Sequence, residues 1–363
     1  MQVHLDDCPD CQQVRTLLHD RNWLVLWLPM EHSRNKLLAR LATAGIAPVA
    51  AETADCHAFL LDRAQAAAFA DAASAVLTAE ELGAGRVACV DADRDATLGD
   101  YLSAVTVGQF AGAVRGHWLL ELIRQDRLTS FFQPIVRADG GRFAYEALLR
   151  GREADGGIVG GGQLMKVADE AGLLHTVDLL ARRTALTSAA GAGIGDATLF
   201  VNFDPSSIYD PSYCLRSTGA LVEELGLTPR NVVFEVTESH EARDEAHLKG
   251  ILDVYRAAGF RVALDDIGSG FSGLRLLSRL KPDFIKIDMD LVRGVHADPF
   301  RQSIAGHLVG MAHDNGILVV AEGVECGEER DWLAAAGVDF MQGYLFGRPE
   351  ARLRQPAPCP GTA

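Results

Sequence analysis

The sequence predicts an α/β protein in which a modified (β/α)8, or TIM, barrel follows a small α/β domain. The chain has 363 residues, more than one ordinary domain, and its 48% apolar content suffices for a large core. From residue 129 onward, eight short apolar runs alternate mostly with helical segments, which is the element order of such a barrel. The runs cover residues 131–136, 143–149, 199–203, 232–236, 262–264, 284–287, 318–320 and 340–345.

The start of the barrel departs from the regular repeat. Only the six residues RADGGR separate the first two runs, which is too short for a crossover helix and suits a hairpin. We therefore expect the first strand of the barrel to be antiparallel to the strand that follows it.

The region before the barrel predicts a smaller domain. Residues 1–105 contain strand candidates at 23–28, 58–61 and 86–90, with helical patterns at 31–43 and 64–77. Residues 106–127 continue a helical pattern and are interpreted as a connector. We expect the barrel over 128–350, a flexible tail over 351–363, and a regulatory role for the N-terminal domain.

Charge and composition restrict the partners. A formal charge of −15 argues against non-specific binding to DNA, RNA or an anionic membrane, because such binding needs clustered Lys and Arg. The first residues, MQVHLDDCPD, have neither the basic nor the apolar part of a signal peptide. Seven scattered cysteines do not resemble a disulfide framework. These features predict a soluble, cytoplasmic protein.

Cys8 and Cys11 form the one cysteine pattern in the chain, and three interpretations remain open. Their spacing and the helical run after them resemble the redox turn of thioredoxin-like folds. Alternatively, the pair supplies half of a zinc site. The third interpretation is that both thiols are incidental. The zinc site would draw on His4, Cys8, Cys11, Cys56 and His57.

Polar residues recur at the ends of the predicted barrel strands, where the mouth of a barrel lies. A carboxylate inside an apolar strand costs several kcal/mol unless it is paired or binds a metal, so a repeated pattern is hard to explain by structure alone. Seven of the eight runs contribute to it. The residues are Glu146, Asn202, Glu235, Asp265, Asp266, Lys286, Glu322 and Gln342.

Carboxylates and amides without thiols or imidazoles describe an oxygen-ligand site, which favours Mg²⁺ or Mn²⁺. The large negative charge predicts two cations, held a few Å apart as in two-metal displacement at phosphorus. Asp265 is a candidate bridge between them. Lys286 lies in an apolar strand and is expected to position a nucleophilic water or to stabilise developing negative charge.

The strings that contain these residues resemble the EAL-domain family of cyclic di-GMP phosphodiesterases. FFQPIVRADGGRFAYEALLRG contains the sequence Glu146-Ala147-Leu148, and VNFDP, FEVTES, DDIGSGFSGL, PDFIKID, AEGVE and QGYLFGRP follow in the family's order. The resemblance covers residues 128–349. It implies a modified barrel with an antiparallel first strand, two divalent metals, and hydrolysis of cyclic di-GMP to linear pGpG.

The resemblance also implies residue roles. It assigns the metal ligands to Glu146, Asn202, Glu235, Asp265, Asp266 and Glu322. It assigns catalytic roles to Lys286, Glu322, Gln342 and Glu238, of which Glu238 anchors the loop after Asp266. It assigns substrate contacts to Gln133, Leu148 and Arg150, with Asp288 and Glu325 flanking the site.

Two functions follow as expectations. The first is an active phosphodiesterase, because the catalytic constellation carries no substitution, and the resemblance further implies a homodimer through the barrel. The second is a receptor module that binds cyclic di-GMP and signals through the N-terminal domain. The departures from the family pattern that matter lie in the loop, at Ile267, Ser269, Phe271 and Gly273.

Overall fold

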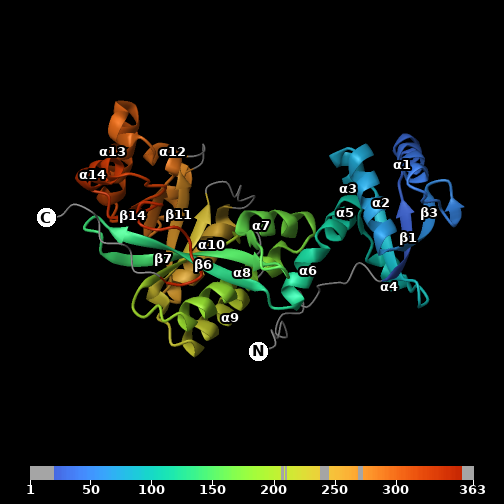
Figure 1. Ribbon diagram of the computed structural model, residues 1–363, viewed down its shortest axis with the longest axis horizontal. Helices are drawn as coiled ribbons and strands as arrows, with labels where there is room; N and C mark the ends of the chain where they lie inside the picture. Colours follow the sequence, from blue (N-terminus) through green and yellow to red (C-terminus); the bar gives the residue numbers. More distant parts are fainter. Residues whose placement is uncertain (1–19, 206–207, 209–210, 238–244, 269–272, 354–363) are drawn as a thin grey trace. The chain divides into compact units, whose positions relative to one another are not determined.

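The computed structural model describes residues 20–205, 208, 211–237, 245–268 and 273–353. The chain divides into two compact units (Figure 1). The N-terminal unit comprises Met1–Arg127 and Glu153–Val177, and the barrel unit comprises Leu128–Arg152 and Asp178–Ala363. Within the described ranges, no helix is both long and apolar enough to cross a membrane.

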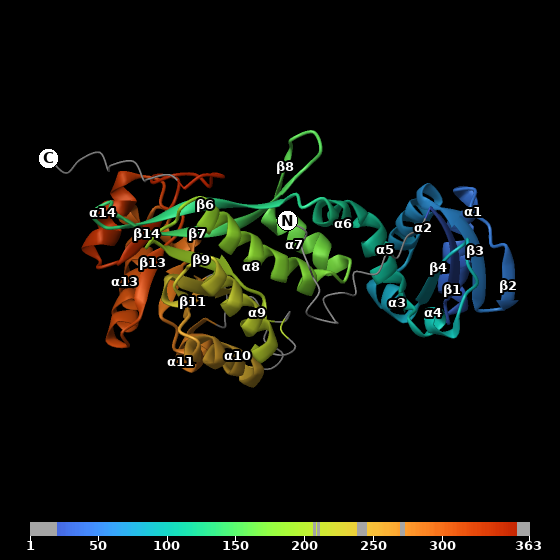
Figure 2. The same ribbon diagram turned by 90° about the horizontal axis from the view of Figure 1, so that it is seen from below.

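The N-terminal unit contains a five-stranded sheet of order β2-β3-β1-β4-β5, in which every pairing is antiparallel (Figure 2). β1, α1 and β2 form a split β-α-β arrangement, because β3 lies between β1 and β2 in the sheet. The elements are β1 (Arg21–Trp27), α1 (Glu31–Thr43), β2 (Ala50–Thr53), β3 (Cys56–Asp62), α2 (Arg63–Val76), α3 (Ala79–Ala84), β4 (Arg86–Asp91), α4 (Leu98–Leu102), β5 (Val105–Thr106), α5 (Val107–Arg115), α6 (His117–Arg124), β8 (Ile158–Gly160) and α7 (Gly161–Glu170).

The main core of this unit lies between its sheet and helices α1, α2 and α5. Alternate residues of β1, Leu24 and Leu26, are buried, as the period of a strand with one buried face requires. Phe59 of β3, Phe69 of α2 and Phe110 of α5 meet edge to face, with ring centroids 5.6 and 5.9 Å apart. Helix α5, within the segment interpreted as a connector, therefore contributes directly to the core.

Short strands were the least predictable elements. β2, β5 and β8 have two to four residues each and were not expected. The strand expected over 340–345 was wrong in its second half, because β14 ends at Gln342. Leu345 donates its backbone N–H to Val324 O, and a Cβ on Gly343 would lie 2.0 Å from the same oxygen. The chain turns there at a glycine because only a residue without a Cβ fits against Val324.

Helices α5 and α7 approach closely at Gly112. A Cβ added there would lie 1.8 Å from the carbonyl oxygen of Glu170, which is backbone and cannot move aside alone. We expect Gly112→Ala to lower the free energy of unfolding by about 1–3 kcal/mol, the usual cost of overpacking. Urea denaturation followed by circular dichroism measures this change.

Gly108, one turn earlier in α5, is the matched control. A Cβ at Gly108 has its nearest neighbour at 3.5 Å, an ordinary contact. Since alanine favours helix over glycine, Gly108→Ala should raise the free energy of unfolding by up to about 1 kcal/mol. Equal effects of the two substitutions would contradict the close approach of α5 and α7.

The barrel unit is built from eight strands and their connecting helices (Figure 1). Its strands are β6 (Leu128–Arg137), β7 (Arg142–Arg152), β9 (Thr198–Asn202), β10 (Val232–Thr237), β11 (Arg261–Ile267), β12 (Phe284–Ile287), β13 (Leu318–Ala321) and β14 (Phe340–Gln342). Its helices are α8 (Leu174–Gly191, whose first residues belong to the N-terminal unit), α9 (Pro211–Glu224), η2 (Pro229–Asn231), α10 (Glu245–Ala257), α11 (Gly273–Leu280), α12 (Met289–Val292), η3 (Val295–Ala297), α13 (Pro299–Asp314) and α14 (Gly327–Ala335).

The strand order β6-β14-β13-β12-β11-β10-β9-β7 closes on itself because β6 also pairs with β7. β6 is antiparallel to both of its neighbours, β7 and β14, while the remaining pairings are parallel. The predicted fold class, a modified barrel with an antiparallel first strand after a small α/β domain, is therefore confirmed.

A layer of apolar side chains fills the bottom of the barrel. Each of the eight strands contributes one buried residue: Ile135, Ala144, Phe200, Val233, Ala263, Phe284, Val320 and Phe340. Phe143 stacks on Phe340 with centroids 3.8 Å apart, and Phe200 meets Phe284 edge to face at 5.2 Å. These eight residues together with Phe143 are here called the aromatic floor, and they close the lower end of the barrel.

Candidate active site

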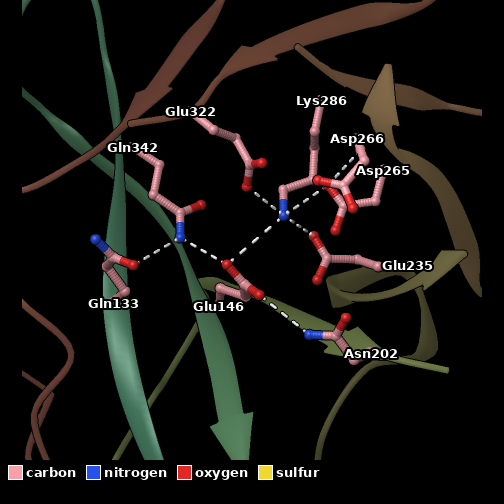
Figure 3. A network of polar contacts seen from close by, with 9 residues as sticks. All are labelled: Gln133, Glu146, Asn202, Glu235, Asp265, Asp266, Lys286, Glu322 and Gln342. Atoms are coloured by element: carbon pink, nitrogen blue, oxygen red, sulfur yellow. Dashed lines mark hydrogen bonds and ion pairs between the residues drawn. The ribbon is translucent and has the colours of Figure 1, made fainter. Parts of the chain in front are cut away.

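The candidate site forms the next layer above the aromatic floor. Since successive side chains of a strand alternate between its two faces, the residue two positions toward the mouth again points into the barrel. In seven strands the inward-pointing residue lies two positions after the residue of the aromatic floor. In β6, which is antiparallel, it lies two positions before the floor residue. The eight residues, here called the polar ring, are Gln133, Glu146, Asn202, Glu235, Asp265, Lys286, Glu322 and Gln342 (Figure 3).

Asp266 joins this ring through an irregularity in β11. The pairing of β11 with β12 shifts register between Leu264 and Ile267, and Asp266 adopts a positive φ of 59°. Its backbone N–H donates to Asp265 Oδ1 at 3.0 Å. Such a bulge re-aims a side chain, so that the carboxylates of Asp265 and Asp266 lie on the same side of the strand, within 4.8 Å of each other and of Glu322. Ile267 then returns to the core outside the barrel.

Lys286 is the cation at the centre of the ring, and its side chain is only 1% exposed. Its Nζ lies 2.6 Å from Glu322 Oε1, 2.8 Å from Glu235 Oε1 and 3.2 Å from Asp265 Oδ1 (Figure 3). Glu146 Oε2 follows at 3.6 Å. One ammonium thus faces four carboxylates, and Asp266 adds a fifth, so the ring retains an excess of negative charge.

Two amides orient Glu146. Asn202 Nδ2 donates to Glu146 Oε1 at 3.0 Å, and Gln342 Nε2 donates to Glu146 Oε2 at 2.6 Å. Gln342 Nε2 also donates to Gln133 Oε1 at 3.1 Å, while Gln133 Nε2 donates to the carbonyl of Gly347 at 3.2 Å. Both carboxylate oxygens of Glu146 are therefore fixed in direction, as a metal ligand requires.

Burial and mutual repulsion perturb the carboxyl groups. Burial, followed by the charges of Glu146 and Asp265, raises the pKa of Glu235 well above its usual value. Burial likewise raises the pKa of Glu322 to about 8, and burial with the adjacent Asp265 raises the pKa of Asp266 to about 6. Burial alone would lower the pKa of Lys286, but the surrounding carboxylates raise it well above its usual value.

Divalent cations fit this donor set. Among the described residues, Glu235 Oε2 and Gln342 Oε1 are buried without a hydrogen-bond donor, which is costly for polar atoms unless another group satisfies them. The atoms that could bind a metal are all oxygen atoms, which Mg²⁺ and Mn²⁺ prefer as ligands. Asp265, Asp266 and Glu322 form the group whose oxygens lie close enough to share an ion.

A cleft of about 220 Å³ opens above the ring. Several residues expected to touch the substrate line it, whereas Leu148 and Arg150 do not. Arg150 instead lies over the ring of Phe131, with its guanidinium carbon 5.6 Å from the ring centroid. The lining residues are Gln133, Glu146, Asp266, Asp288, Met289, Arg293, Glu322, Gly323, Glu325, Gln342, Gly343 and Tyr344.

Other predictions have structural outcomes of their own. Asp288 lines the cleft, and it also caps α12 by accepting the N–H of Asp290 at 2.8 Å. Glu325 forms an ion pair with Arg293 at 2.6 Å on the rim of the cleft. Glu238 and loop residues 269–272 lie outside the described residues, as do Cys8 and Cys11. The described cysteines Cys56, Cys89 and Cys326 form no disulfide.

Some residues near the site were not anticipated. Arg293 and Tyr344 line the cleft, and no strand-end pattern marks Arg293. Tyr344 follows Gln342 by two residues in the string QGYLFG. The guanidinium carbon of Arg348 lies over its ring, 4.0 Å from the centroid of that ring. Position in that string was the available signal for Tyr344.

A buried ion pair supports the end of β9. Arg182 Nη2 lies 3.0 Å from Asp178 Oδ2, and Arg182 Nη1 donates to the hydroxyl of Tyr255 at 3.0 Å. Asp178 Oδ1 accepts the backbone N–H of Asp204 at 3.0 Å. Since Asp204 follows Asn202 by two residues, this pair fixes the backbone that carries a polar-ring amide.

Comparison with known families agrees with this geometry. The family model described as "EAL domain" matches residues 117–349, more than half of the chain. The chain belongs to the EAL-domain family of cyclic di-GMP phosphodiesterases. Its EAL domain is similar to that of the probable cyclic di-GMP phosphodiesterase PdeG of Escherichia coli K12, at 32% identity over 241 residues, covering 64% of this chain and 46% of PdeG.

A second relative carries a different kind of name. The blue light- and temperature-regulated antirepressor BluF of Escherichia coli K12 is 32% identical over 218 residues, covering 60% of this chain and 53% of BluF. The chain thus spans about half the length of these two curated relatives.

Solved structures with the EAL fold include complexes with cyclic di-GMP. An EAL protein of Vibrio cholerae O395 in its c-di-GMP-bound form matches with a TM-score of 0.58 and 36% identity, covering 64% of this chain and 96% of that one. The PaMucR phosphodiesterase in complex with c-di-GMP matches with a TM-score of 0.58 and 28% identity, with the same coverage.

Proposed function

We propose that the chain hydrolyses cyclic di-GMP to linear pGpG with the help of two Mg²⁺ or Mn²⁺ ions. The observation that carries this proposal is the polar ring, in which every barrel strand contributes one chemically useful side chain at the same height. Structural roles alone do not explain four carboxylates around a buried ammonium, because burying such charges is costly. A site that stabilises charge during a reaction explains it.

In this proposal the ring's carboxylates and amide hold the ions. Glu146, Asn202, Glu235, Asp265, Asp266 and Glu322 are the proposed ligands, with Asp265 between the two positions. When bound, two such ions would lower the pKa of a water molecule and polarise the phosphodiester. This chemistry suits a buried site that is rich in oxygen donors.

The remaining ring residues would act on water and charge. Lys286 keeps its proton, because the carboxylates around it raise its pKa, and its ammonium would stabilise the negative charge that develops at phosphorus. Gln342 has a buried Oε1 that lacks a donor among the described residues, and this atom would accept a hydrogen bond from the attacking water. Gln133 fixes the Gln342 amide by accepting from its Nε2.

The proposed reaction has a direct test. Full-length protein incubated with cyclic di-GMP and Mn²⁺ or Mg²⁺ is expected to release pGpG, resolved by chromatography, and a chelator should abolish the product. Restoring Mn²⁺ after chelation should restore the rate. If cyclic di-GMP stays undegraded both with Mn²⁺ and with Mg²⁺, the proposal is contradicted.

A second candidate function is a binding module that senses cyclic di-GMP. The name of BluF, an antirepressor, favours it, because a relative with about the same identity is not named an enzyme. Retention of cyclic di-GMP by the chain without turnover would identify this second function. The complete polar ring supports the enzyme, since a receptor needs contacts to the ligand rather than a buried Lys286 that four carboxylates surround.

The organisation of the chain is proposed in the same terms. We propose a regulatory N-terminal domain over residues 1–105, a helical connector over 106–127, the phosphodiesterase barrel over 128–350 and a tail over 351–363. We also propose a homodimer formed through the barrel. Leu148 and Arg150 remain proposed substrate contacts, although neither lines the cleft above the ring.

A further inference from the structure

We propose that His296, Cys326 and Glu329 form a second metal site, distinct from the polar ring, that binds Zn²⁺. These residues come from two neighbouring segments of the barrel unit: His296 from η3, Cys326 as the N-cap of α14, and Glu329 from the first turn of α14. One ligand atom from each side chain lies within 4.8 Å of the other two. None of the three lines the cleft above the ring.

The donor types favour Zn²⁺ over the ions expected at the ring. A thiolate, an imidazole and a carboxylate form a mixed sulfur, nitrogen and oxygen set, which suits zinc and not the hard ions Mg²⁺ or Mn²⁺. With Zn–S and Zn–N bonds of about 2.3 and 2.1 Å, tetrahedral ligand atoms lie roughly 3.5 Å apart. The three ligand atoms, which lie within 4.8 Å of one another, would move to about that distance when the ion binds.

The surroundings hold the site in place. Glu329 Oε1 accepts the N–H of Gly294 at 2.8 Å, and Oε2 accepts the N–H of Glu325 at 2.8 Å. Oε2 also accepts the N–H of Cys326 at 3.3 Å, so these bonds fix the carboxylate and Oε1 keeps a lone pair for a cation. The thiol of Cys326 donates a hydrogen bond to Glu328, and His296 is exposed, so that a water molecule can reach the ion as its fourth ligand.

Zinc at this site would brace one rim of the cleft. Glu329 ties the loop after α12 to the loop after β13, and those loops carry Arg293 and Glu325, the ion pair on the rim. A cation bound between His296 and Cys326 would add a third connection between the same two loops. The site is therefore placed to restrict movement of Arg293 and Glu325.

Cobalt provides a readout that does not depend on activity. Co²⁺ occupies zinc sites, and a Co²⁺–thiolate bond gives a charge-transfer band in the near ultraviolet, whereas an oxygen-only site such as the ring gives none. The reference protein is the reduced, metal-free full chain with Cys8→Ser and Cys11→Ser, which removes the other candidate thiol site. We expect this reference to show the band at one equivalent of Co²⁺, and Zn²⁺ to displace it while excess Mg²⁺ does not.

Two variants in the reference chain decide the assignment. Cys326→Ser should abolish the band and His296→Ala should abolish or strongly weaken it. Serine is favoured at an N-cap, so Cys326→Ser should fold, which circular dichroism checks. Absence of the band from the reference, or its persistence after Cys326→Ser, would overturn the proposed site whatever the outcome of the phosphodiesterase assay.

Discussion

Replacing Asp265 with asparagine is expected to lower kcat for cyclic di-GMP by at least about 10²-fold, which corresponds to about 2.7 kcal/mol of transition-state stabilisation. Asparagine has nearly the same shape, and its Oδ1 can still accept the backbone N–H of Asp266, which lies 3.0 Å from Asp265 Oδ1. The substitution therefore removes charge and keeps the bulge of β11. Initial rates of pGpG formation at saturating Mn²⁺ measure the effect.

Asp290→Asn is the matched control for this substitution. Asp290 is an exposed carboxylate of α12 near the cleft and belongs neither to the ring nor to the cleft lining. Its replacement should leave kcat unchanged. Near-normal turnover by folded Asp265→Asn protein would contradict the two-metal proposal, because the residue proposed to bridge the ions would then be dispensable.

Lys286→Met is expected to abolish turnover and also to destabilise the chain when divalent cations are absent. The substitution leaves Glu235, Glu322 and Asp265 without the ammonium that lies 2.6–3.2 Å from each of them. Breaking a buried ion pair by removing one partner costs about 3–5 kcal/mol. Chemical denaturation in the presence of a chelator measures this loss of unfolding free energy.

Divalent cations should partly reverse the instability of Lys286→Met. Ligands that bind only the folded state stabilise it, and the variant's uncompensated carboxylates attract cations more strongly than the wild-type ring does. Mn²⁺ should therefore raise the melting temperature of the variant by more than that of the wild type. Lys281→Met, at an exposed lysine between α11 and β12, should change neither stability nor turnover. An unchanged unfolding free energy for Lys286→Met would contradict the proposed charge balance.

Much of the polar ring could be predicted from sequence because a barrel strand has a simple period. A residue such as Phe284, in an apolar run, predicts an interior position, and Lys286 two residues later then also points inward. Gln133 obeys the same rule in reverse, since β6 is antiparallel and its site residue precedes Ile135. For Gln133 the resemblance to a known family, rather than the period, supplied the prediction.

Other features could not be predicted because they depend on tertiary context. Asp265 and Asp266 were both expected at the site, but strand alternation would aim them at opposite faces, and the bulge in β11 that brings them together was not predicted. Asp178 and Arg182 are four residues apart on a helix, a spacing typical of exposed pairs, yet their side chains are 3% and 1% exposed. Neither the alternation of a strand nor the four-residue spacing on a helix shows which side chains neighbouring elements will bury.

The zinc-site cluster was equally hidden. His296 and Cys326 are thirty residues apart in separate elements, and no spacing rule joins them. The sequence instead directed attention to Cys8 and Cys11, whose spacing is a familiar one. The contact between η3 and the start of α14 brings His296 close to Cys326 and Glu329, and only the fold shows it.

The aromatic floor has a consequence for how ligands enter and leave the barrel. Phe143, Phe200, Phe284 and Phe340 close the end opposite the mouth, so the lumen is a blind tube and not a channel. Any molecule that reaches the polar ring must leave through the opening by which it entered. A product molecule therefore blocks the entry of the next substrate molecule, and the rate of product release sets an upper limit on turnover.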